Sequence, residues 1–353
     1  MKYSIRNNQV VKQRSSRKSV REWGFLLLAL SFLIACSSNE NEPEKTRVLL
    51  DTDANNELDD QHAIAYMLFN GDYFDVEGIT VNRTSNGGDV SKHYEEAERV
   101  VKLCDLHGKI DIYTGADGSF EEIKEHINEP AFDGMEAVDF IIERAHAKSD
   151  RKLVLLPVGK LTNIALAVKK DPSIASMVRI VWLGSNYPDP GEYNQVNDIS
   201  AMQYLLDAEV DLEVVTVRYD KPSGTAAVKA LLSEIEEKMP GKGPTVSEPV
   251  TGRHGNEFVT FGDYAVSLFR NIDDYDGDPP SRALYDMAAL AIVKNPSWAV
   301  KSMIPAPEYV DDTWIDRPDN THEITIWEDF DKKSILDDFY ASMEDYVLAS
   351  ESK

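Results

Sequence analysis

VLLDTDANNELDD, residues 48–60, joins a short apolar run to a dense group of carboxylates. An apolar run bounded by polar residues is typical of a buried β-strand. Residues 63–69 (AIAYMLF) are apolar on almost every side, which predicts a helix buried against a sheet. A buried strand followed directly by a buried helix indicates an α/β protein whose helices cover a parallel sheet.

The same alternation continues through the rest of the chain. Strand-like runs with few polar interruptions are separated by helical stretches, which predicts a mostly parallel open sheet with helices on both faces and a Rossmann-like core. No shift in composition marks a boundary, so we expect one α/β domain over residues 47–353, with a flap at the Gly- and Pro-rich stretch 218–257. The expected strands are residues 47–51, 76–81, 152–157, 178–183 and 212–217, and the expected helices lie near residues 58–70, 91–105, 133–148, 160–170, 198–208, 258–271, 282–294 and 334–348.

The charge balance limits the partners that the protein can have. Its 353 residues include 62 acidic and 37 basic side chains, a formal net charge of −25. The first 35 residues hold seven of the basic side chains and one acidic one, so 30 basic and 61 acidic residues remain beyond them. A protein this acidic has no general affinity for nucleic-acid phosphates, so we expect no nucleic-acid partner.

The N-terminal segment has the pattern of a secretion signal. A basic stretch over residues 1–22 precedes a 13-residue apolar run, Trp23–Ala35, which is too short to span a bilayer comfortably. This run leads through Leu-Ile-Ala into Cys36, which resembles a bacterial lipoprotein lipobox. The resemblance implies a signal peptide over residues 1–35, a lipid anchor on Cys36 and a place in the bacterial cell envelope, periplasmic or surface-facing. The polar residues 36–46 would form an acidic tether.

The carboxylates of the opening segment predict a cation site. Asp51 and Asp53 are two apart at the carboxyl end of a strand, so they point to the same side, at the edge where open α/β sheets bind ligands. Asp59 and Asp60 begin the following helix. Carboxylates about 5–6 Å apart repel by roughly 3 kcal/mol per pair at an effective dielectric constant of 20. A divalent cation offsets this repulsion, and an all-oxygen shell suits Ca²⁺ or Mg²⁺.

Other loops also carry carboxylates after a strand or helix. A solvated acidic turn that caps a helix remains an alternative. An EF-hand is excluded because its sixth and twelfth positions require glycine and glutamate, and Asn56 and His62 stand there. A Mg²⁺-dependent phosphatase of the haloacid dehalogenase type also uses D-x-D after an apolar strand, but its pattern has threonine or valine where Asn55 stands.

Four segments, in order, resemble the inosine/uridine-preferring nucleoside hydrolase family. The family's first strand ends in D-x-D-P-G-x-D-D, whereas residues 51–60 read DTDANNELDD, two residues longer and without Pro-Gly. Residues 156–166 (LPVGKLTNIAL) resemble the family's G-P-L-T-N-x-A segment. Residues 284–290 (LYDMAAL) resemble its late H-D-x-x-A segment. Between these two, the family's asparagine, E-F-N triplet and aspartate are matched in spacing by Asn186, Glu192-Tyr193-Asn194 and Asp198.

The resemblance implies a Ca²⁺ ion shared by the protein and a bound ribose. Its ligands would be Asp53, Asp60, the carbonyl of Val158 and Asp286, and Asp53 would also be the general base for water. Sugar hydroxyls can complete the shell because Ca²⁺ accepts up to about eight oxygens in flexible geometry. The other implied ribose contacts are Asp59 at the 2′-hydroxyl, Asn194 on the 3′ side, Asn186 and Glu192 at the 5′-hydroxyl, and Asn86, for which Asn82 and Ser85 are alternatives.

The reaction implied is hydrolysis of the N-glycosidic bond of ribonucleosides or related ribosides, through an oxocarbenium-like transition state. The family often has histidine before the late aspartate, as the acid that protonates the leaving base, but Tyr285 stands there. A phenol is a poorer proton donor than an imidazole at neutral pH. Either Tyr285 therefore contacts the base, or another group such as His254 donates the proton. The resemblance also leaves open a homo-oligomer and a non-catalytic riboside-binding lipoprotein.

Four further residues are expected to have structural roles. Asp198 is predicted to cap a helix, and Asn163 to hold loop backbone. Asp51 is predicted to orient its neighbours without binding the cation directly. Cys104, on an apolar helical stripe, is predicted to be a small core residue.

Overall fold

The computed structural model describes residues 44–351, and the described residues from Lys45 onward form one compact unit. The expected signal peptide, Cys36 and nearly all of the expected tether therefore lie outside the described residues. Within the described part of the chain, no helix is both long and apolar enough to cross a membrane.

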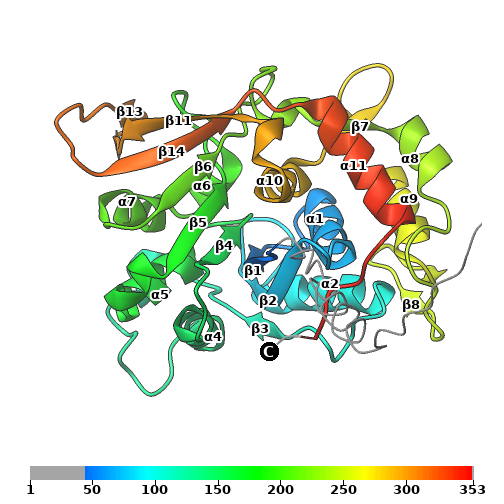
Figure 1. Cartoon of the computed structure of the whole chain (residues 1–353), viewed down its shortest axis with the longest axis horizontal. Helices are drawn as coiled ribbons and strands as arrows, with labels where there is room; N and C mark the ends of the chain where they lie inside the picture. The colour runs from blue at the N-terminus through cyan, green and yellow to red at the C-terminus, as the bar shows by residue number, and fades with distance from the viewer. Residues whose placement is uncertain (1–43, 352–353) are drawn as a thin grey trace, which may run out of the picture. The chain divides into compact units, whose positions relative to one another are not determined.

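An eight-stranded sheet in the order β11-β14-β6-β5-β4-β1-β2-β3 forms the centre of the unit (Figure 1). All neighbouring pairs are parallel except β11 with β14 at one edge. The sheet therefore confirms the predicted mostly parallel α/β fold. Its strands are β1 (Thr46–Thr52), β2 (Phe74–Val81), β3 (Ile112–Thr114), β4 (Leu153–Pro157), β5 (Val178–Leu183), β6 (Leu212–Val215), β11 (Val300–Pro305) and β14 (Glu323–Glu328).

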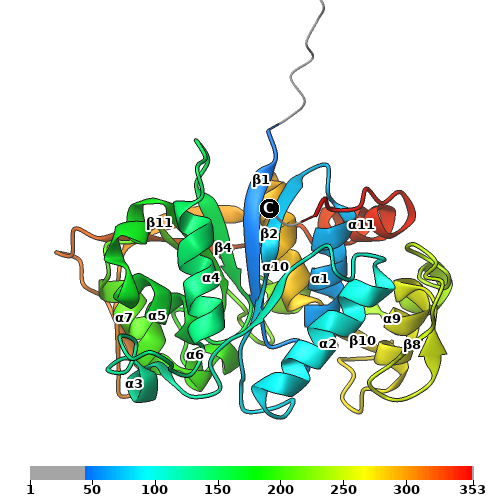
Figure 2. The same cartoon turned by 90° about the horizontal axis from the view of Figure 1, so that it is seen from below.

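Helices cover both faces of the sheet and form two apolar cores (Figure 2). Alternate residues of β1 divide between them: Val48 and Leu50 enter one core, and Leu49 enters the other. The first core contains residues of α1 (Asp59–Phe69), α2 (Val90–Leu103), α9 (Phe261–Arg270), α10 (Tyr285–Lys294) and α11 (Lys332–Glu344). The second contains residues of α3 (Phe120–Ile123), α4 (Met135–His146), α5 (Thr162–Lys170) and α7 (Ile199–Asp207).

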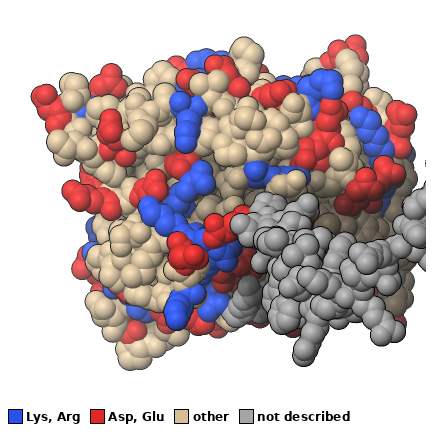
Figure 3. Space-filling model, viewed as in Figure 1, with Lys and Arg blue, Asp and Glu red and all other residues tan. Residues whose placement is uncertain are grey.

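Shorter elements surround the ends of the strands. The remaining α-helices of the described residues are α6 (Tyr193–Asn197) and α8 (Leu232–Lys238). Three small hairpins or pairs lie outside the main sheet: β7 (Lys229–Leu231) with β10 (Ser281–Ala283), β8 (Val250–Thr251) with β9 (Glu257–Phe258), and β12 (Glu308–Val310) with β13 (Thr313–Ile315). On the face seen in Figure 3, basic side chains lie among acidic ones.

The five predicted strands are confirmed, with differences at some boundaries. The strand expected over residues 212–217 ends at Val215. The Thr216 N–H still donates to Trp327 of β14, but the Val217 N–H donates to Ser185 in a loop. The helix expected from residue 282 begins at Tyr285, because Ser281–Ala283 pairs with β7. The pattern did not reveal β3, β11 and β14. β11 is largely exposed and β3 has three residues, so neither has the apolar run by which buried strands are recognised.

The fold places the acidic segment at the carboxyl edge of the sheet. Asp53 directly follows β1, Val158 follows β4, and α1 and α10 begin at the same edge. Cys104 is fully buried, as expected, and it is a free cysteine.

Candidate active site

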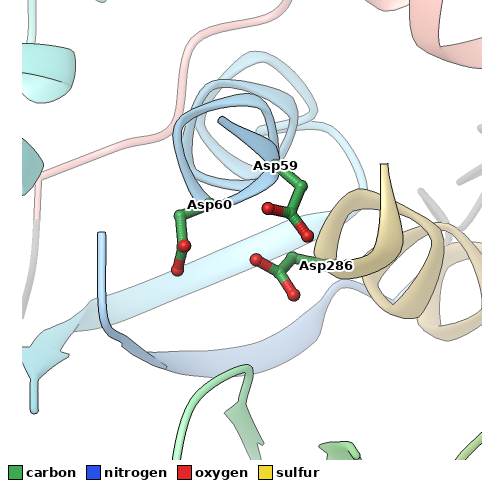
Figure 4. A group of neighbouring side chains, drawn as sticks. All are labelled: Asp59, Asp60 and Asp286. Atoms are coloured by element: carbon green, nitrogen blue, oxygen red, sulfur yellow. The ribbon is translucent and has the colours of Figure 1, made fainter. Parts of the chain in front are cut away.

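Three carboxylates meet between the first turns of two neighbouring helices. Asp59 and Asp60 begin α1, and Asp286 is the second residue of α10. One oxygen of each lies within 4.8 Å of the other two, and all three residues are buried. Figure 4 shows the two α1 side chains and the Asp286 side chain extending toward one another. Both helices present the positive ends of their dipoles here, which stabilises negative charge. This stabilisation offsets only part of the repulsion among the three carboxylates.

Burial and mutual repulsion hold these carboxyl groups toward their neutral form. Burial, with the charge of Glu57 second, raises the pKa of Asp59 to about 7. Burial and then Asp53 raise the pKa of Asp60 well above its usual range. The pKa of Asp286 is likewise raised by burial and by the charges of Asp59 and Asp60. Carboxylates are buried in this way where a cation or a proton compensates them.

Asp53 lies beside this triad and is held by a neighbouring hydroxyl. The side chain of Thr84 donates a hydrogen bond to Asp53 Oδ2. Burial raises the pKa of Asp53 to about 7 despite this bond. A Cβ placed on Gly159 would lie 2.8 Å from both Asp53 Oδ1 and Asn82 Oδ1. Gly159 therefore leaves open a small space into which two oxygens point.

Asp51 supports the site from beneath, as expected. Its carboxylate accepts hydrogen bonds from Thr80 Oγ1 (2.6 Å), Asn82 Nδ2 (2.9 Å) and Asn163 Nδ2 (2.7 Å). Asn163 also accepts a bond from the Ala116 N–H at 2.9 Å, which confirms that it holds loop backbone. Asp198 caps α7 by accepting from the Ala201 N–H at 3.0 Å, and this prediction is also confirmed.

The donor set fits a hard divalent cation. The carboxylates of the triad, Asp53 and the carbonyl of Val158 line one cavity of about 300 Å³. Asn194 Nδ2 donates to that carbonyl at 2.8 Å, which fixes its direction. Asn82 Oδ1 is buried and has no hydrogen-bond partner among the described residues, so it is free to bind water beside Asp53. These are all oxygen donors, the type that Ca²⁺ and Mg²⁺ prefer, with no sulfur or imidazole among them.

The cavity brings together most of the residues that the sequence singled out. Tyr285 and Glu192 also line it, and so do several residues that the sequence analysis did not select. Glu57 and Arg282 are in this second group, and they form an ion pair at its wall. The complete lining is Asp53, Asn56, Glu57, Asp59, Asp60, Val158, Leu183, Glu192, Tyr193, Asn194, Val217, Tyr219, Arg282, Tyr285 and Asp286.

Glu192 has a structural role that its expected sugar contact does not explain. It caps α6, accepting hydrogen bonds from the N–H groups of Ser185 (2.8 Å), Asn194 (3.0 Å) and Gln195 (2.9 Å). Asn186 lies one step further out, where its Oδ1 accepts from the Tyr219 N–H at 3.2 Å. Asn186 is buried but is not part of the cavity lining. In this structure it contacts Tyr219, which lines the cavity.

Two predicted site residues lie in a neighbouring cavity instead. His254 and Asn86 line a cavity of about 290 Å³ that shares Asn56, Glu57 and Arg282 with the central one. Asn86 is exposed, and its N–H donates to Tyr193 Oη at 3.0 Å. Sequence spacing could not place these two, because both belong to loops whose course depends on contacts with distant segments.

Comparisons with known proteins identify a family and similar sequences. The sequence model of the family described as inosine-uridine preferring nucleoside hydrolase matches residues 48–336. "Probable uridine nucleosidase 2" of Oryza sativa subsp. japonica is 30% identical over 201 residues, which are 49% of this chain and 57% of that protein. The pyrimidine-specific ribonucleoside hydrolase RihB of Escherichia coli (strain SE11) is 27% identical over 246 residues, 62% of this chain and 74% of that one. The chain thus spans less than two thirds of the length of the rice protein.

Solved structures share the fold. The plant nucleoside hydrolase PpNRh1 superposes with a TM-score of 0.65 at 19% identity, covering 85% of this chain and 99% of that one. A purine-preferring ribonucleoside hydrolase from Gardnerella vaginalis gives a TM-score of 0.63, also at 19% identity, over 84% of this chain and 98% of that one. Identities this low show likeness of fold only.

Proposed function

This chain belongs to the inosine-uridine preferring nucleoside hydrolase family, and from that premise we propose that it hydrolyses the N-glycosidic bond of ribonucleosides or related ribosides with Ca²⁺ at its acidic cluster. The observation that carries the proposal is the buried triad of Asp59, Asp60 and Asp286, whose oxygens lie within 4.8 Å of one another beside Asp53. A bound cation would compensate the charges of this buried group.

We propose Ca²⁺ over Mg²⁺ as the ion. Asp53, Asp60, Asp286 and the Val158 carbonyl would hold the ion, with Asp59 next to it. Mg²⁺ requires a near-ideal octahedron and keeps its waters, whereas Ca²⁺ tolerates six to eight oxygens in flexible geometry. When bound, the cation would lower the pKa of a water in its shell and grip the vicinal hydroxyls of the ribose.

The side chains of the chain itself would perform the remaining steps. Asp53 would accept the proton of the attacking water, with Thr84 fixing the orientation of its carboxylate. Asp59 would accept from the 2′-hydroxyl, and Asn194 would lie on the 3′ side. The surrounding carboxylates would stabilise the positive charge that develops on the sugar ring as the base departs.

Protonation of the leaving base is the step for which the site is least equipped. Burial, with Asp59 second, raises the pKa of Tyr285 above its ordinary value near 10. Its phenol therefore holds its proton tightly at neutral pH. His254 lies in the adjoining cavity and not in the central one.

A phosphatase of the dehalogenase type has less support. It would need a free aspartate at the D-x-D segment to attack phosphate, and Asp51 is enclosed by three hydrogen-bond donors. The family match also favours the N-ribohydrolase. A non-catalytic riboside-binding protein would keep the same pocket, so turnover has to separate these two.

We further propose that the mature protein is anchored by lipid at Cys36 in the bacterial cell envelope. The support is the sequence alone: a basic start, a 13-residue apolar run and a cysteine directly after Leu-Ile-Ala.

The test of the proposed function uses the purified protein without residues 1–36, assayed with uridine, inosine and p-nitrophenyl riboside. Release of base or nitrophenolate with Ca²⁺, and its loss with a chelator, is the expected result. Asp53→Asn should lower the rate of cleavage by at least about 10³-fold, while riboside binding remains measurable. Binding without any turnover by the unaltered protein would favour the non-catalytic alternative.

A further inference from the structure

The wall of the central cavity contains one cationic side chain among the described residues that line it, and this is Arg282. The same lining includes five carboxyl groups besides Glu192 and no histidine. Arg282 stands in β10, three residues before Tyr285. Asp59 and Tyr285 line the same cavity as Arg282.

Arg282 is held in a fixed position by two acidic residues. Its Nη2 forms an ion pair with Glu57, and its Nη1 donates to both the carboxylate and the carbonyl of Asp274 at 3.1 Å. The Arg282 side chain is only 12% exposed. A guanidinium has about five N–H donors in a rigid fork, and these contacts use three of them. The Arg282 side chain lines the central cavity, where the proposal below places the other N–H groups.

We propose that Arg282 stabilises the departing nucleobase anion by donating hydrogen bonds to it, in place of a general acid. This inference rests on the proposed N-ribohydrolase function. A guanidinium stays protonated throughout the physiological range, so it supplies charge and hydrogen bonds without giving up a proton. A preorganised donor in a largely buried site stabilises developing negative charge strongly.

The step balances without a proton from the protein. The C1′–N bond breaks and its electron pair stays on the nitrogen, so the base leaves as an anion against Arg282. Water adds to C1′, and its proton passes to Asp53 and then to solvent. Solvent returns one proton to the base anion. The sum is riboside plus water giving ribose and the neutral base.

The Arg282 guanidinium also has a structural role, because its ion pair with Glu57 anchors the loop that carries Asn56 and Glu57. A purely positioning role would therefore also reduce activity when Arg282 is replaced. Arg253 provides a matched control, because its Nη2 donates to the Asn55 carbonyl at 2.9 Å and so anchors the same loop. Arg253 lines the neighbouring cavity and not the central one.

The experiment compares two leaving groups in the unaltered protein, R282Q, R282K and R253Q, with Ca²⁺ present. Uridine releases a basic anion that needs stabilisation, whereas p-nitrophenyl riboside releases a phenolate that needs little. We expect R282Q to lower kcat/KM for uridine by about 10²-fold or more, and for p-nitrophenyl riboside by less than about 10-fold. R253Q should lower both by the same factor. If R282Q does not fold, R282K carries the comparison, with a smaller shift in the same direction.

Equal losses on the two substrates in R282Q and R282K would overturn the inference, because they would leave Arg282 only its anchoring role. A pH profile of uridine cleavage that falls on the alkaline side between pH 7 and 9 would also oppose it, since it would reveal a titrating acid. If the unaltered protein cleaves neither substrate with Ca²⁺, the proposed function itself has failed. Cleavage of both by the unaltered protein, with an unchanged ratio in R282Q, refutes only the role of Arg282.

Discussion

Replacing Asp286 by asparagine should stabilise the metal-free protein and remove most of its response to Ca²⁺. Asp286 faces Asp59 and Asp60 with oxygens within 4.8 Å. At that distance each charged pair repels by about 3 kcal/mol at an effective dielectric constant of 20. Proton uptake by the cluster already relieves part of this repulsion, because the pKa of each carboxyl group is raised. We therefore expect a gain of about 1–3 kcal/mol at pH 8, after the asparagine amide has lost some of the interactions of the carboxylate.

Thermal unfolding with and without Ca²⁺ measures both effects. The metal-free Asp286→Asn protein should unfold about 2–5 °C above the metal-free parent. Ca²⁺ at about 100 times its dissociation constant should stabilise the parent by about 2.7 kcal/mol, and the variant by much less. Asp198→Asn is a suitable control, because Asp198 caps α7 and also accepts from the Phe120 N–H at 2.7 Å. That variant should lose stability equally in both conditions.

The reasoning is refuted if Asp286→Asn is less stable than the parent without metal and keeps the full Ca²⁺ increment. Such a result would mean that the triad is held by hydrogen bonds and does not bind the cation. A variant that is destabilised in both conditions, like Asp198→Asn, would give Asp286 a structural role only.

Three further outcomes are expected from the same structure. The metal-free protein should lose stability from pH 5 to pH 8. Burial raises the pKa values of Asp53 and Asp59 from 3.8 to about 7, so their stabilising protonated forms are lost as the pH rises through that value. Urea unfolding should show this fall in the free energy of unfolding, and saturating Ca²⁺ should flatten it; a rise in metal-free stability toward pH 8 would contradict the prediction. Thr84→Val should lower kcat for uridine by about 10-fold with little change in KM, because Thr84 orients Asp53. The control Thr80→Val removes a hydrogen-bond donor to Asp51 and should affect stability more than kcat. The reverse pattern would assign the role of general base to Asp51. Cys36→Ala should abolish metabolic labelling by radioactive palmitate and release the protein from membranes, and labelling that persists would exclude the proposed anchor.

Local pattern was sufficient to predict β1, β2, β4, β5 and β6 and the acidic segment that follows the first of them. Residues 48–50 are fully buried, and their apolar run predicted a buried strand because apolar side chains on both faces require burial on both faces. The spacing of Asp51 and Asp53, and the start of α1 at Asp59, followed from the same segment. The supporting role of Asp51 also followed, because a carboxylate inside a strand must find donors on neighbouring elements.

The rest of the site depends on contacts between segments far apart in the chain. Arg282 reaches Glu57 across 225 residues, and no period or motif marks either residue. Tyr219 enters the cavity from the loop after β6, and the ordinary composition of that loop gave no reason to select it. For His254 and Asn86 the reason is the opposite: they were selected as polar loop residues, and the paths of their loops place them in the adjoining cavity.

The position of Arg282 also relates the unusual opening loop to catalysis. Residues 54–58 include Glu57, which faces the guanidinium, and Asn55, whose carbonyl accepts from Arg253. A carboxylate that repels Asp59 is thus retained next to the cluster, at a cost in stability that Arg282 partly offsets. If Arg282 stabilises the leaving base, Glu57 serves to aim its fork into the cavity, and Glu57→Gln should weaken uridine cleavage more than nitrophenyl riboside cleavage. The same change should stabilise the metal-free protein by removing one negative charge. If the Glu57 charge is retained for catalysis, its removal should make the fold more stable and the cleavage of poor leaving groups slower.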